Sequence, residues 1–479
     1  GGHSLLAMQL VARVREQLQA PLSLLELFSH PTLAAQAGLL APRVGATPAE
    51  SAPVASGQTR HPASFAQRRL WFIEQMKLDV GTYVMPAAVR LQGTLSVPAL
   101  RVAVQRLVAR HAVLRTAFAE VDGQVCQQEL SAAGLPLPVL EASVADAERV
   151  ARQWLSWVDF DLAAGRLFRA ALVRLDGREH WLLLQMHHIV SDGWSMQVLW
   201  SELSALYADA LSGAAALPGL PLQYGDYARW QQAWWQGERL QAAERYWQQS
   251  LAGAPQVLRL PTDRPRPAVQ SLRGATLGVT LPARWRERLQ AFCQRHEVTL
   301  FMALLAPFAQ LLGRLAGQEE VLIGVPMSNR SHRVLEGLIG FFVNTLVLRL
   351  GPDQAADGVT AMQQVRAQIL SAYAHQDLPF ERLVELLNPE RDPRHTPLFQ
   401  VMYSLDQEGE SLPAAAPGAL RIDPAPLPVE AVAKFDLSLN LRDARGQLTA
   451  VFTYNRDLFD EATVQRWADH YLALVGQWL

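Results

Sequence analysis

The chain has 479 residues, more than one ordinary hydrophobic core needs, so at roughly 150 residues per domain we expect about three structural units. Its 43 Lys and Arg nearly balance its 45 Asp and Glu, so no net field favours nucleic acid or an anionic membrane surface. Cys126 and Cys293 cannot build a disulfide framework or a zinc site unaided, and no run approaches the ~20 apolar residues of a membrane span, so we expect a cytoplasmic protein without nucleic-acid or membrane partners.

The first forty residues have the pattern of three short helices. Leu and Val recur every four residues over 4–19, which places one apolar stripe on a helix that begins at Ser4. A second helix is predicted over 23–28, and a third over 32–40. Residues 1–41 therefore read as a small helical bundle.

The next segment, residues 42–63, is rich in Pro, Ala, Gly and Ser without an apolar period, which is linker composition. Strands and helices then alternate through 64–235 and again through 236–479. Each half runs strand, Pro-led helix, central strand, which indicates two similar α/β lobes. The predicted strands are 87–92, 169–175, 180–186, 275–281 and 321–325, and the predicted helices are 97–111, 196–211, 282–296 and 300–315.

The sharpest chemical feature follows the apolar run Trp181–Leu184. A run that is apolar on both faces predicts a central strand, and this one delivers His187 and His188 to its end, where functional sites gather. Imidazole suits proton transfer at neutral pH. Asp192 can fix a tautomer or hold the loop, and Gly193 lets a backbone N–H approach a substrate oxygen.

The histidine pair also has plainer interpretations. Without context, two adjacent histidines are more often a packing or capping pair than a catalyst. Neighbouring side chains on a strand point to opposite faces, so the two imidazoles are poorly placed to share a metal ion. The sequence has no Gly-x-Ser-x-Gly turn, which argues against a serine hydrolase.

Seven motifs in order nevertheless resemble the condensation domain of nonribosomal peptide synthetases. The active-site motif of that family is His-His-x-x-x-Asp-Gly, which residues 187–193 match. The resemblance covers nearly the whole chain after the linker. The other six motifs are SFAQRRLW at 64–71, RHAVLRTAF at 110–118, YGDYARW at 224–230, IGVPMSNR at 323–330, GFFVNTL at 340–346 and HQDLPFE at 375–381.

The start of the chain resembles a second family. The sequence GGHSLL at 1–6, followed by FSHPTL at 28–33, is similar to the second half of a peptidyl carrier domain, in which the serine carries phosphopantetheine. The resemblance implies covalent 4'-phosphopantetheine on Ser4. A plain helix N-cap is the alternative for this serine. A phosphodiester there would lie at the positive end of the following helix, where anions are stabilised.

The condensation-domain resemblance implies a fold and a mechanism. Two lobes like those of chloramphenicol acetyltransferase form a V, and a tunnel between them admits one carrier arm from each side. His188 would lie in the tunnel, as a general base or as a group that holds the attacking amine. An amino-acid amine has a pKa near ~8 and needs orientation more than deprotonation, so we favour positioning with late proton acceptance. The Gly193 N–H is our candidate oxyanion donor.

Five further residues are expected to support this site. His187 should face the lobe core as a hydrogen-bonded structural residue. Asp192 carries a charge beside a core strand and needs a cationic partner, either Arg330 or Arg69. We favour Arg330, because a salt bridge between the lobes would seal the tunnel. Asn344, with Gly340 and Phe342, is expected to lie within a strand that lines the junction, and an ordinary buried strand is the alternative.

The implied activity is a peptide bond between a donor aminoacyl or peptidyl thioester and the amine of an acceptor aminoacyl thioester. The implied partners are upstream and downstream carrier and adenylation domains, their carrier-bound thioesters and a phosphopantetheinyl transferase. No epimerase domain fits between Ser4 and Ser64. The family resemblance also implies that carriers which serve an epimerase tend to read Gly-Gly-Asp-Ser, whereas this carrier reads Gly-Gly-His-Ser. We therefore expect an L-configured donor.

Other members of the superfamily remain alternatives to different degrees. An epimerisation domain would show a Glu-Gly-His-Gly-Arg segment, which is absent, and heterocyclisation domains replace the paired histidines with aspartate. A dual epimerisation and condensation domain and a non-catalytic carrier-recruiting module both stay open. The intact His188, Asp192 and Gly193 argue against the recruiting module.

Overall fold

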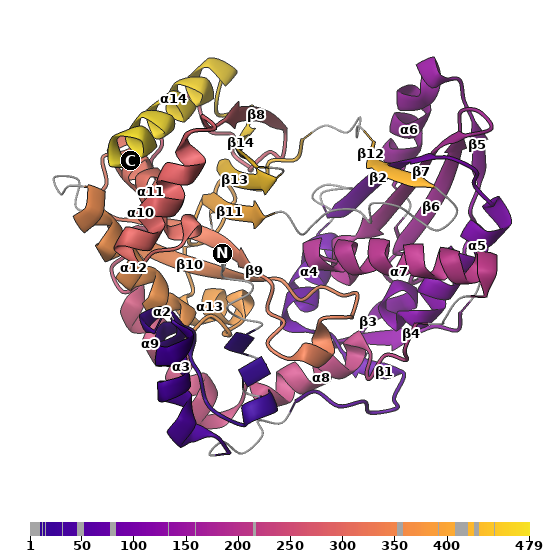
Figure 1. Ribbon diagram of the computed structural model, residues 1–479, viewed down its shortest axis with the longest axis horizontal. Coiled ribbons are helices and arrows are strands. Elements are labelled where there is room, and N and C mark those ends of the chain that lie inside the picture. Colours follow the sequence, from indigo (N-terminus) through magenta and orange to yellow (C-terminus); the bar gives the residue numbers. More distant parts are fainter. Residues whose placement is uncertain are drawn as a thin grey trace.

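The computed structural model shows two α/β lobes side by side, with a small helical piece against one of them (Figure 1). The piece belongs to the N-terminus and lies against the second lobe. The structure describes the chain apart from residues 1–9, 12, 15, 31, 46–51, 77–82, 133, 159, 214–216, 352–357, 391, 408–419, 426–430 and 445.

Strand β7 (Glu179–His187) lies in the middle of the first lobe's large sheet, whose strand order is β12-β2-β7-β6-β5. Its side chains alternate between two cores, because Leu182 and Leu184 belong to the cluster of α5 and α7, whereas Trp181 and Leu183 belong to that of α6. The apolar run thus forms the predicted central strand. The other elements here are β2 (Val84–Gln92), β5 (Val139–Glu141), β6 (Phe168–Arg174), β12 (Arg421–Pro424), α5 (Val97–Arg110), α6 (Ala147–Ser156) and α7 (Gly193–Ser212).

A three-stranded sheet of order β1-β4-β3 completes the first lobe. Asp122 and Gly123 join β3 to β4 with φ angles of 52° and 74°, the left-handed pair that a two-residue hairpin turn requires. The elements are β1 (Arg60–Pro62), β3 (Thr116–Val121), β4 (Gln124–Glu129), α4 (Phe65–Gln75), α8 (Tyr224–Trp234), η2 (Ala112–Arg115), η3 (Val144–Asp146) and η4 (His188–Val190).

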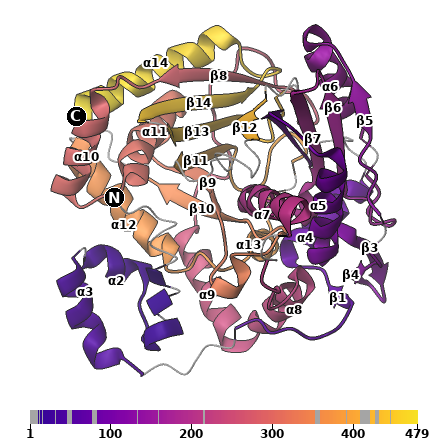
Figure 2. The same ribbon diagram turned by 45° about the vertical axis from the view of Figure 1, so that its right-hand side comes forward.

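The second lobe is built on a six-stranded sheet of order β10-β9-β11-β13-β14-β8, in which β11 runs parallel to both of its neighbours (Figure 2). Helix α11 (Leu300–Ala316) is buried on all sides from Phe301 to Gly313, and it packs against α12 and α14. The other elements are α9 (Gly237–Ser250), β8 (Gly274–Thr280), α10 (Trp285–His296), β9 (Val321–Met327), η5 (Arg333–Leu335), β10 (Asn344–Leu350), α12 (Gly358–Tyr373), α13 (Phe380–Leu387), β11 (Val401–Gln407), β13 (Leu437–Ala444), β14 (Gln447–Asn455) and α14 (Glu461–Trp478).

Two segments of the second half of the chain enter the first lobe. Strand β12 pairs antiparallel with β2, with Ile422 opposite Leu91. Residues 328–343, which we name the crossing loop, connect β9 to β10 and place Leu338 and Phe342 in the first lobe's core. The lobes are therefore interlocked, although the sequence suggested a simple division after residue 235.

The N-terminal piece packs against the second lobe. The residues described between 10 and 18 are helical, and α2 (Leu24–Ser29) and α3 (Leu33–Leu40) follow with η1 (Ala41–Arg43). Ser23 caps α2 through a complete capping box with Glu26. Val14 and Leu27 join the same buried cluster as α11 and α12. Three predicted helices are thus observed in their described parts, and Ser4 lies outside the described residues.

Most predicted elements after residue 64 are observed within a few residues of their expected ends. Helix α7 begins at Gly193, earlier than expected, because Asp192 caps it. Strand β1 falls inside the stretch that reads as linker, where it pairs with β4. Strand β10 begins at Asn344, so the residues before it belong to the crossing loop instead of a strand.

No single helix in the described ranges is long and apolar enough to cross a membrane. Helices α10 and α11 pass such a test only together, and they are bent by 97° at the break between them.

Candidate functional site

His187 is the last residue of β7, and its ring is buried toward the first lobe's interior. Its Nδ1 accepts a hydrogen bond from the Ile189 N–H at 3.1 Å. The other nitrogen, Nε2, must then carry the proton, which it donates to Glu74 Oε1 at 3.1 Å. Both ring nitrogens are occupied within the fold.

His188 follows at the start of η4 and is half-buried. Its backbone N–H donates to the Tyr83 carbonyl at 2.7 Å, which ties the loop to the beginning of β2. Nδ1 lies 2.8 Å from the Ser191 carbonyl, an acceptor only, so Nδ1 carries the proton. Nε2 is left with its lone pair, and the ring stands edge-on to Phe341 of the crossing loop, with centroids 4.9 Å apart.

The surroundings hold His188 in the neutral form. Burial, followed by the nearby positive charge of Lys434, lowers the pKa of His188 to about 3. The Asp192 carboxylate acts in the opposite direction but does not compensate. At physiological pH the imidazole is therefore a hydrogen-bond acceptor at Nε2 and a weak base.

Asp192 is the N-cap of α7 and is 3% exposed. Its Oδ1 accepts from the Ser195 N–H at 2.8 Å, and its Oδ2 accepts from the Phe342 N–H at 2.9 Å. The carboxylate thus joins the first turn of α7 to the crossing loop.

Arg330 supplies the countercharge. Its Nη2 lies 3.3 Å from Asp192 Oδ1, and its guanidinium stands 3.9 Å above the ring of Phe342. Nη1 donates to the carbonyls of Leu335 and Leu338 at 2.5 and 2.8 Å. Arg330, which belongs to the crossing loop, is therefore the cationic partner of Asp192, and Arg69 is not.

Ser195 belongs to this network and was not singled out from the sequence. Its hydroxyl lies 2.7 Å from Asp192 Oδ1 and 2.8 Å from the Gly340 carbonyl, and it accepts from the Gly340 N–H at 3.0 Å. Arg330 Nη2 donates to the same oxygen at 3.0 Å. The signal was present in the sequence, because a serine three residues after a capping aspartate lies in the first helical turn.

Gly193 is the first residue of α7, and it is exposed. Its φ is not in the left-handed region, and a Cβ built there would meet nothing within 4 Å among the described residues. Neither backbone conformation nor packing therefore requires glycine at this position. The adjoining space is open at the N-terminus of a helix, where N–H groups point outward.

Arg69 and Asn344 tie the lobes and loops at other points. Arg69 Nη1 lies 3.8 Å from Glu381 Oε1, so α4 of the first lobe meets α13 of the second. Asn344 donates from Nδ2 to the Leu378 carbonyl at 2.9 Å and accepts from the Phe380 N–H at 3.0 Å. Asn344 thereby fixes the start of α13.

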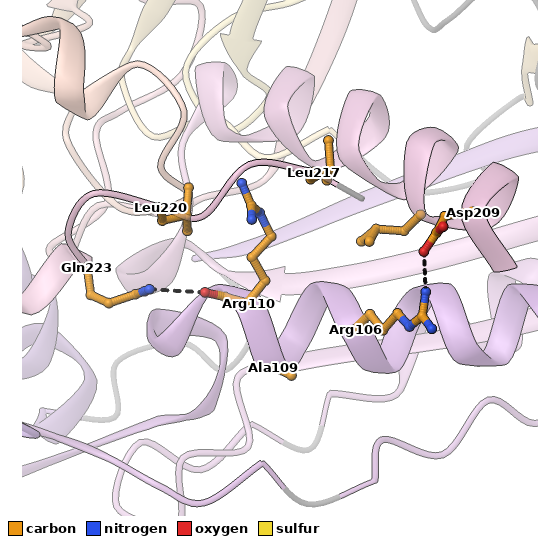
Figure 3. A pocket seen from close by; sticks show the side chains of 8 residues that line it. Arg106, Ala109, Arg110, Asp209, Leu217, Leu220 and Gln223 are labelled. Carbon is orange, nitrogen blue, oxygen red and sulfur yellow. Dashed lines mark hydrogen bonds and ion pairs between the residues drawn. The ribbon is translucent and has the colours of Figure 1, made fainter. Parts of the chain in front are cut away.

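A separate hollow of about 580 Å³ lies between α5 and α7 (Figure 3). Its two arginines are already paired, Arg106 with Asp209 at 2.5 Å and Arg110 with Glu202 at 3.0 Å. We therefore assign no ligand to it. Among the residues that the structure describes, no group of His, Cys, Asp and Glu side chains could hold a metal ion.

Two family profiles match the chain: the condensation domain over residues 57–479, and the phosphopantetheine attachment site over residues 1–40. The chain therefore belongs to the condensation-domain family, with part of a carrier domain in front. The first match begins just before β1, which agrees with the pairing of that strand to β4.

The relatives are nonribosomal peptide synthetases that are much longer than this chain. A linear gramicidin synthase of Brevibacillus parabrevis is 42% identical over 99% of this chain and 6% of its own length. Malpinin synthetase of Mortierella alpina is 41% identical, with the same shares covered. The chain thus spans about 6% of the length of these relatives.

Solved structures share the fold. The X-domain from teicoplanin biosynthesis superposes with a TM-score of 0.81 at 29% identity, covering 88% of this chain and 95% of that one. The four-domain nonribosomal peptide synthetase holo-AB3403 gives a TM-score of 0.78 at 24% identity, covering 88% of this chain and 33% of that one. An epimerization domain of tyrocidine synthetase B gives 0.71 at 20% identity. The last two are alike in fold alone.

These comparisons confirm the family, the two-lobed fold class and the enzyme class. Condensation domains of nonribosomal peptide synthetases form amide bonds by an acyltransferase-type reaction. The attachment-site match implies covalent 4'-phosphopantetheine, a flexible arm that presents an acyl group as a thioester.

Proposed function

We propose that this segment joins a donor acyl group, held on the phosphopantetheine of Ser4, to the amine of an aminoacyl thioester on a downstream carrier. The tautomer of His188 carries the proposal. Because Nδ1–H is bound to the Ser191 carbonyl at 2.8 Å, Nε2 keeps its lone pair, and the ring lies beside Phe341 of the crossing loop. Such a nitrogen is suited to accept an N–H of the attacking amine.

In the reaction, the amine nitrogen attacks the donor carbonyl carbon, and the carbon–sulfur bond breaks. The proton lost by nitrogen goes to the leaving thiolate, by way of His188 Nε2. Since the pKa of His188 is depressed to about 3, its larger contribution is to orient the amine, and proton acceptance comes late. The Gly193 N–H, at the positive end of α7, is the proposed donor to the carbonyl oxygen as negative charge develops.

The remaining site residues have supporting roles in this proposal. His187 fixes the end of β7 through Glu74, and Asp192 with Arg330 holds the loop that carries His188 against the crossing loop. Arg69 and Asn344 act at a distance, through α13.

The proposed donor is L-configured. Its support is the order of parts in the sequence, in which there is no room for an epimerase domain between Ser4 and Ser64, and the Gly-Gly-His-Ser form of the carrier motif. The proposed partners are the neighbouring carrier and adenylation domains and a phosphopantetheinyl transferase. We place the reaction in the cytosol, where the free thiols of Cys126 and Cys293 would stay reduced.

One experiment tests donor and reaction together. The segment, with its complete carrier, is loaded with matched donors that end in an L- or a D-residue, and transfer to one loaded acceptor carrier is followed by mass spectrometry. We expect an L,L product from the L-donor and little product from the D-donor. Preference for the D-donor, or an inverted product from the L-donor, contradicts the proposed stereochemistry and favours the dual epimerising alternative.

A recruiting module is the second candidate, and one comparison favours it. The X-domain, similar at 30% identity with a TM-score of 0.80, was solved as a complex with OxyB. In the same assay a recruiting module would give no product from either donor while still binding loaded carriers.

A further inference from the structure

Lys434 is one of two lysines in the whole sequence, the other being Lys77. It lies just before β13 in the second lobe, and its backbone is held firmly. Its carbonyl accepts from Gln270 Nε2 at 3.2 Å. Two residues later, the buried Asp436 accepts from Arg266 Nη1 at 2.9 Å. The start of the Lys434 side chain therefore has a fixed place.

The side chain reaches across to the first lobe. Its Nζ stands 5.0 Å from the centroid of the Tyr83 ring, a cation–π arrangement. The carbonyl of Tyr83 is the acceptor for the His188 N–H, at 2.7 Å. The Lys434 side chain thus lies against Tyr83, whose carbonyl binds the His188 N–H. The positive charge of Lys434 contributes to the lowered pKa of His188.

No carboxylate within the described ranges pairs with the Lys434 ammonium. The other charged groups that face this region come from α4, from the N-cap of α7 and from α13. Asp192 and Glu381 are paired with cations, Arg330 at 3.3 Å and Arg69 at 3.8 Å, and Glu74 accepts a hydrogen bond from the neutral His187 at 3.1 Å. Among the described residues, Lys434 is therefore a positive charge without a directly paired carboxylate, beside the candidate reaction centre.

We propose that Lys434 is a positioning residue for the condensation reaction, whose charge disfavours a second cation beside His188 and so keeps the acceptor amine unprotonated. This inference rests on the proposed function. A protonated amine has no lone pair and cannot attack a thioester. Two positive charges in a site partly withdrawn from water repel one another far more than in bulk solvent, so the neutral amine is favoured.

The same arrangement limits the effect to a range of pH. Burial, and then the charge of Arg69, lowers the pKa of Lys434 to about 8. Below that pH the ammonium is charged and lowers the pKa of a neighbouring amine. Above it Lys434 becomes neutral, and its influence disappears. Tyr83 stays protonated throughout, because burial raises the pKa of its phenol.

The test is the pH dependence of single-turnover condensation by Lys434→Met, Lys434→Arg and Lys434→Glu, with saturating loaded carriers, between pH 6 and pH 9.5. We expect the acid limb of Lys434→Met to move to higher pH, with a rate about tenfold lower near pH 6.5 for each unit by which the amine pKa rises. Lys434→Arg should keep the wild-type acid limb, and Lys434→Glu should move it further. Wild type and Lys434→Met should converge near pH 9.

Arg442→Met removes an exposed cation from β13 and is the matched control, which should leave the profile unchanged. A Lys434→Met profile that is lower by the same factor at every pH overturns the inference and indicates a packing role. A loss confined to carboxylate-bearing substrates also overturns it. If wild type makes no product at any pH, the proposed function has failed instead.

A second measurement guards against misfolding. Reductive ¹³C-methylation labels Lys434, Lys77 and the terminal amine, and Lys434→Met identifies the Lys434 signal in the intact segment. We expect that signal to titrate below the other lysine, with the rest of the spectrum unchanged in the variant. An ordinary lysine titration at Lys434 contradicts the inference.

Discussion

His187 and His188 are neighbours in the sequence, but their hydrogen-bond partners give them opposite tautomers. The proton of His187 is on Nε2 and is committed to Glu74, whereas the proton of His188 is on Nδ1 and is committed to the Ser191 carbonyl. Of the two histidines, His188 is the one whose second ring nitrogen has no hydrogen-bond partner among the described residues. This difference separates a residue that holds the fold from one that meets substrate.

Replacing each histidine by alanine should separate these two roles. His188→Ala should reduce peptide formation by roughly 10²–10⁴-fold with little change in melting temperature, because the ring is half-buried and no described residue binds its Nε2. His187→Ala should lower the free energy of unfolding by about 1–3 kcal/mol, because the Ile189 N–H loses its buried acceptor. Condensation rates and thermal unfolding measure both effects. Equal activity and equal stability of the two variants would contradict the assignment.

Asp192 should be a stability residue as well as a site residue. Asp192→Ala leaves the buried Arg330 without its countercharge, and we expect a loss of about 3–5 kcal/mol and a lower rate. Denaturant unfolding measures the loss. The matched control is Asp146→Ala, which breaks an exposed ion pair with Arg149 and should cost far less. Equal losses for the two variants would show that the buried pair is not important.

At the scale of elements, the crossing loop is the connection on which the site depends. It brings Phe341 to His188, binds Asp192 through the Phe342 N–H and packs Leu338 into the first lobe. Tyr224 closes the same contact from α8, because its hydroxyl donates to the Phe341 carbonyl at 2.6 Å. The loop has little regular structure of its own, so these contacts fix its shape.

Two glycines of the crossing loop test how tightly it is packed. A Cβ at Gly340 would lie 2.0 Å from Tyr224 Cδ2, inside any allowed contact, whereas a Cβ at Gly337 would meet nothing within 4 Å of the described residues. Gly340→Ala should therefore cost about 1–3 kcal/mol and reduce condensation, and Gly337→Ala should change neither. Thermal unfolding and single-turnover rates decide. Wild-type behaviour of Gly340→Ala would show that the loop is freely adjustable.

At the scale of the whole molecule, the N-terminal piece and the condensation domain share a buried cluster and a polar contact. Glu16 Oε1 accepts from the Arg333 N–H of the crossing loop at 3.2 Å. The helix that follows Ser4 in the sequence thus touches the loop that holds Asp192 through Arg330. A carrier in this position lies in contact with the part of the fold that shapes the site.

Loading of the carrier is the prediction at this scale. With the first part of the carrier domain restored, a phosphopantetheinyl transferase and coenzyme A should modify Ser4, and intact-mass measurement should show one added arm. Ser4→Ala should show none, and Ser23→Ala, which removes the cap of α2, should still be modified. A mass gain that survives Ser4→Ala would place the attachment elsewhere.

The sequence predicted features that depend on local pattern or on paired charges. The run Trp181–Leu184 predicted a central strand, and the need of Asp192 for a partner predicted Arg330. Features that depend on distant contacts were missed. β12 is a four-residue strand without a readable period, and Lys434 lies in a loop whose proximity to His188 exists only in the folded chain.

The strand that β12 contributes across the molecule has a consequence for recombining synthetases. A chimaera joined at the boundary between the lobes would take β2 from one parent and β12 from the other. The pairs from Gln92 with Arg421 to Val89 with Pro424 would then join residues of two different proteins. A mismatch there would expose the backbone of β2 as an open sheet edge, which invites aggregation. Exchange points that keep residues 57–479 from a single parent preserve every one of these pairings.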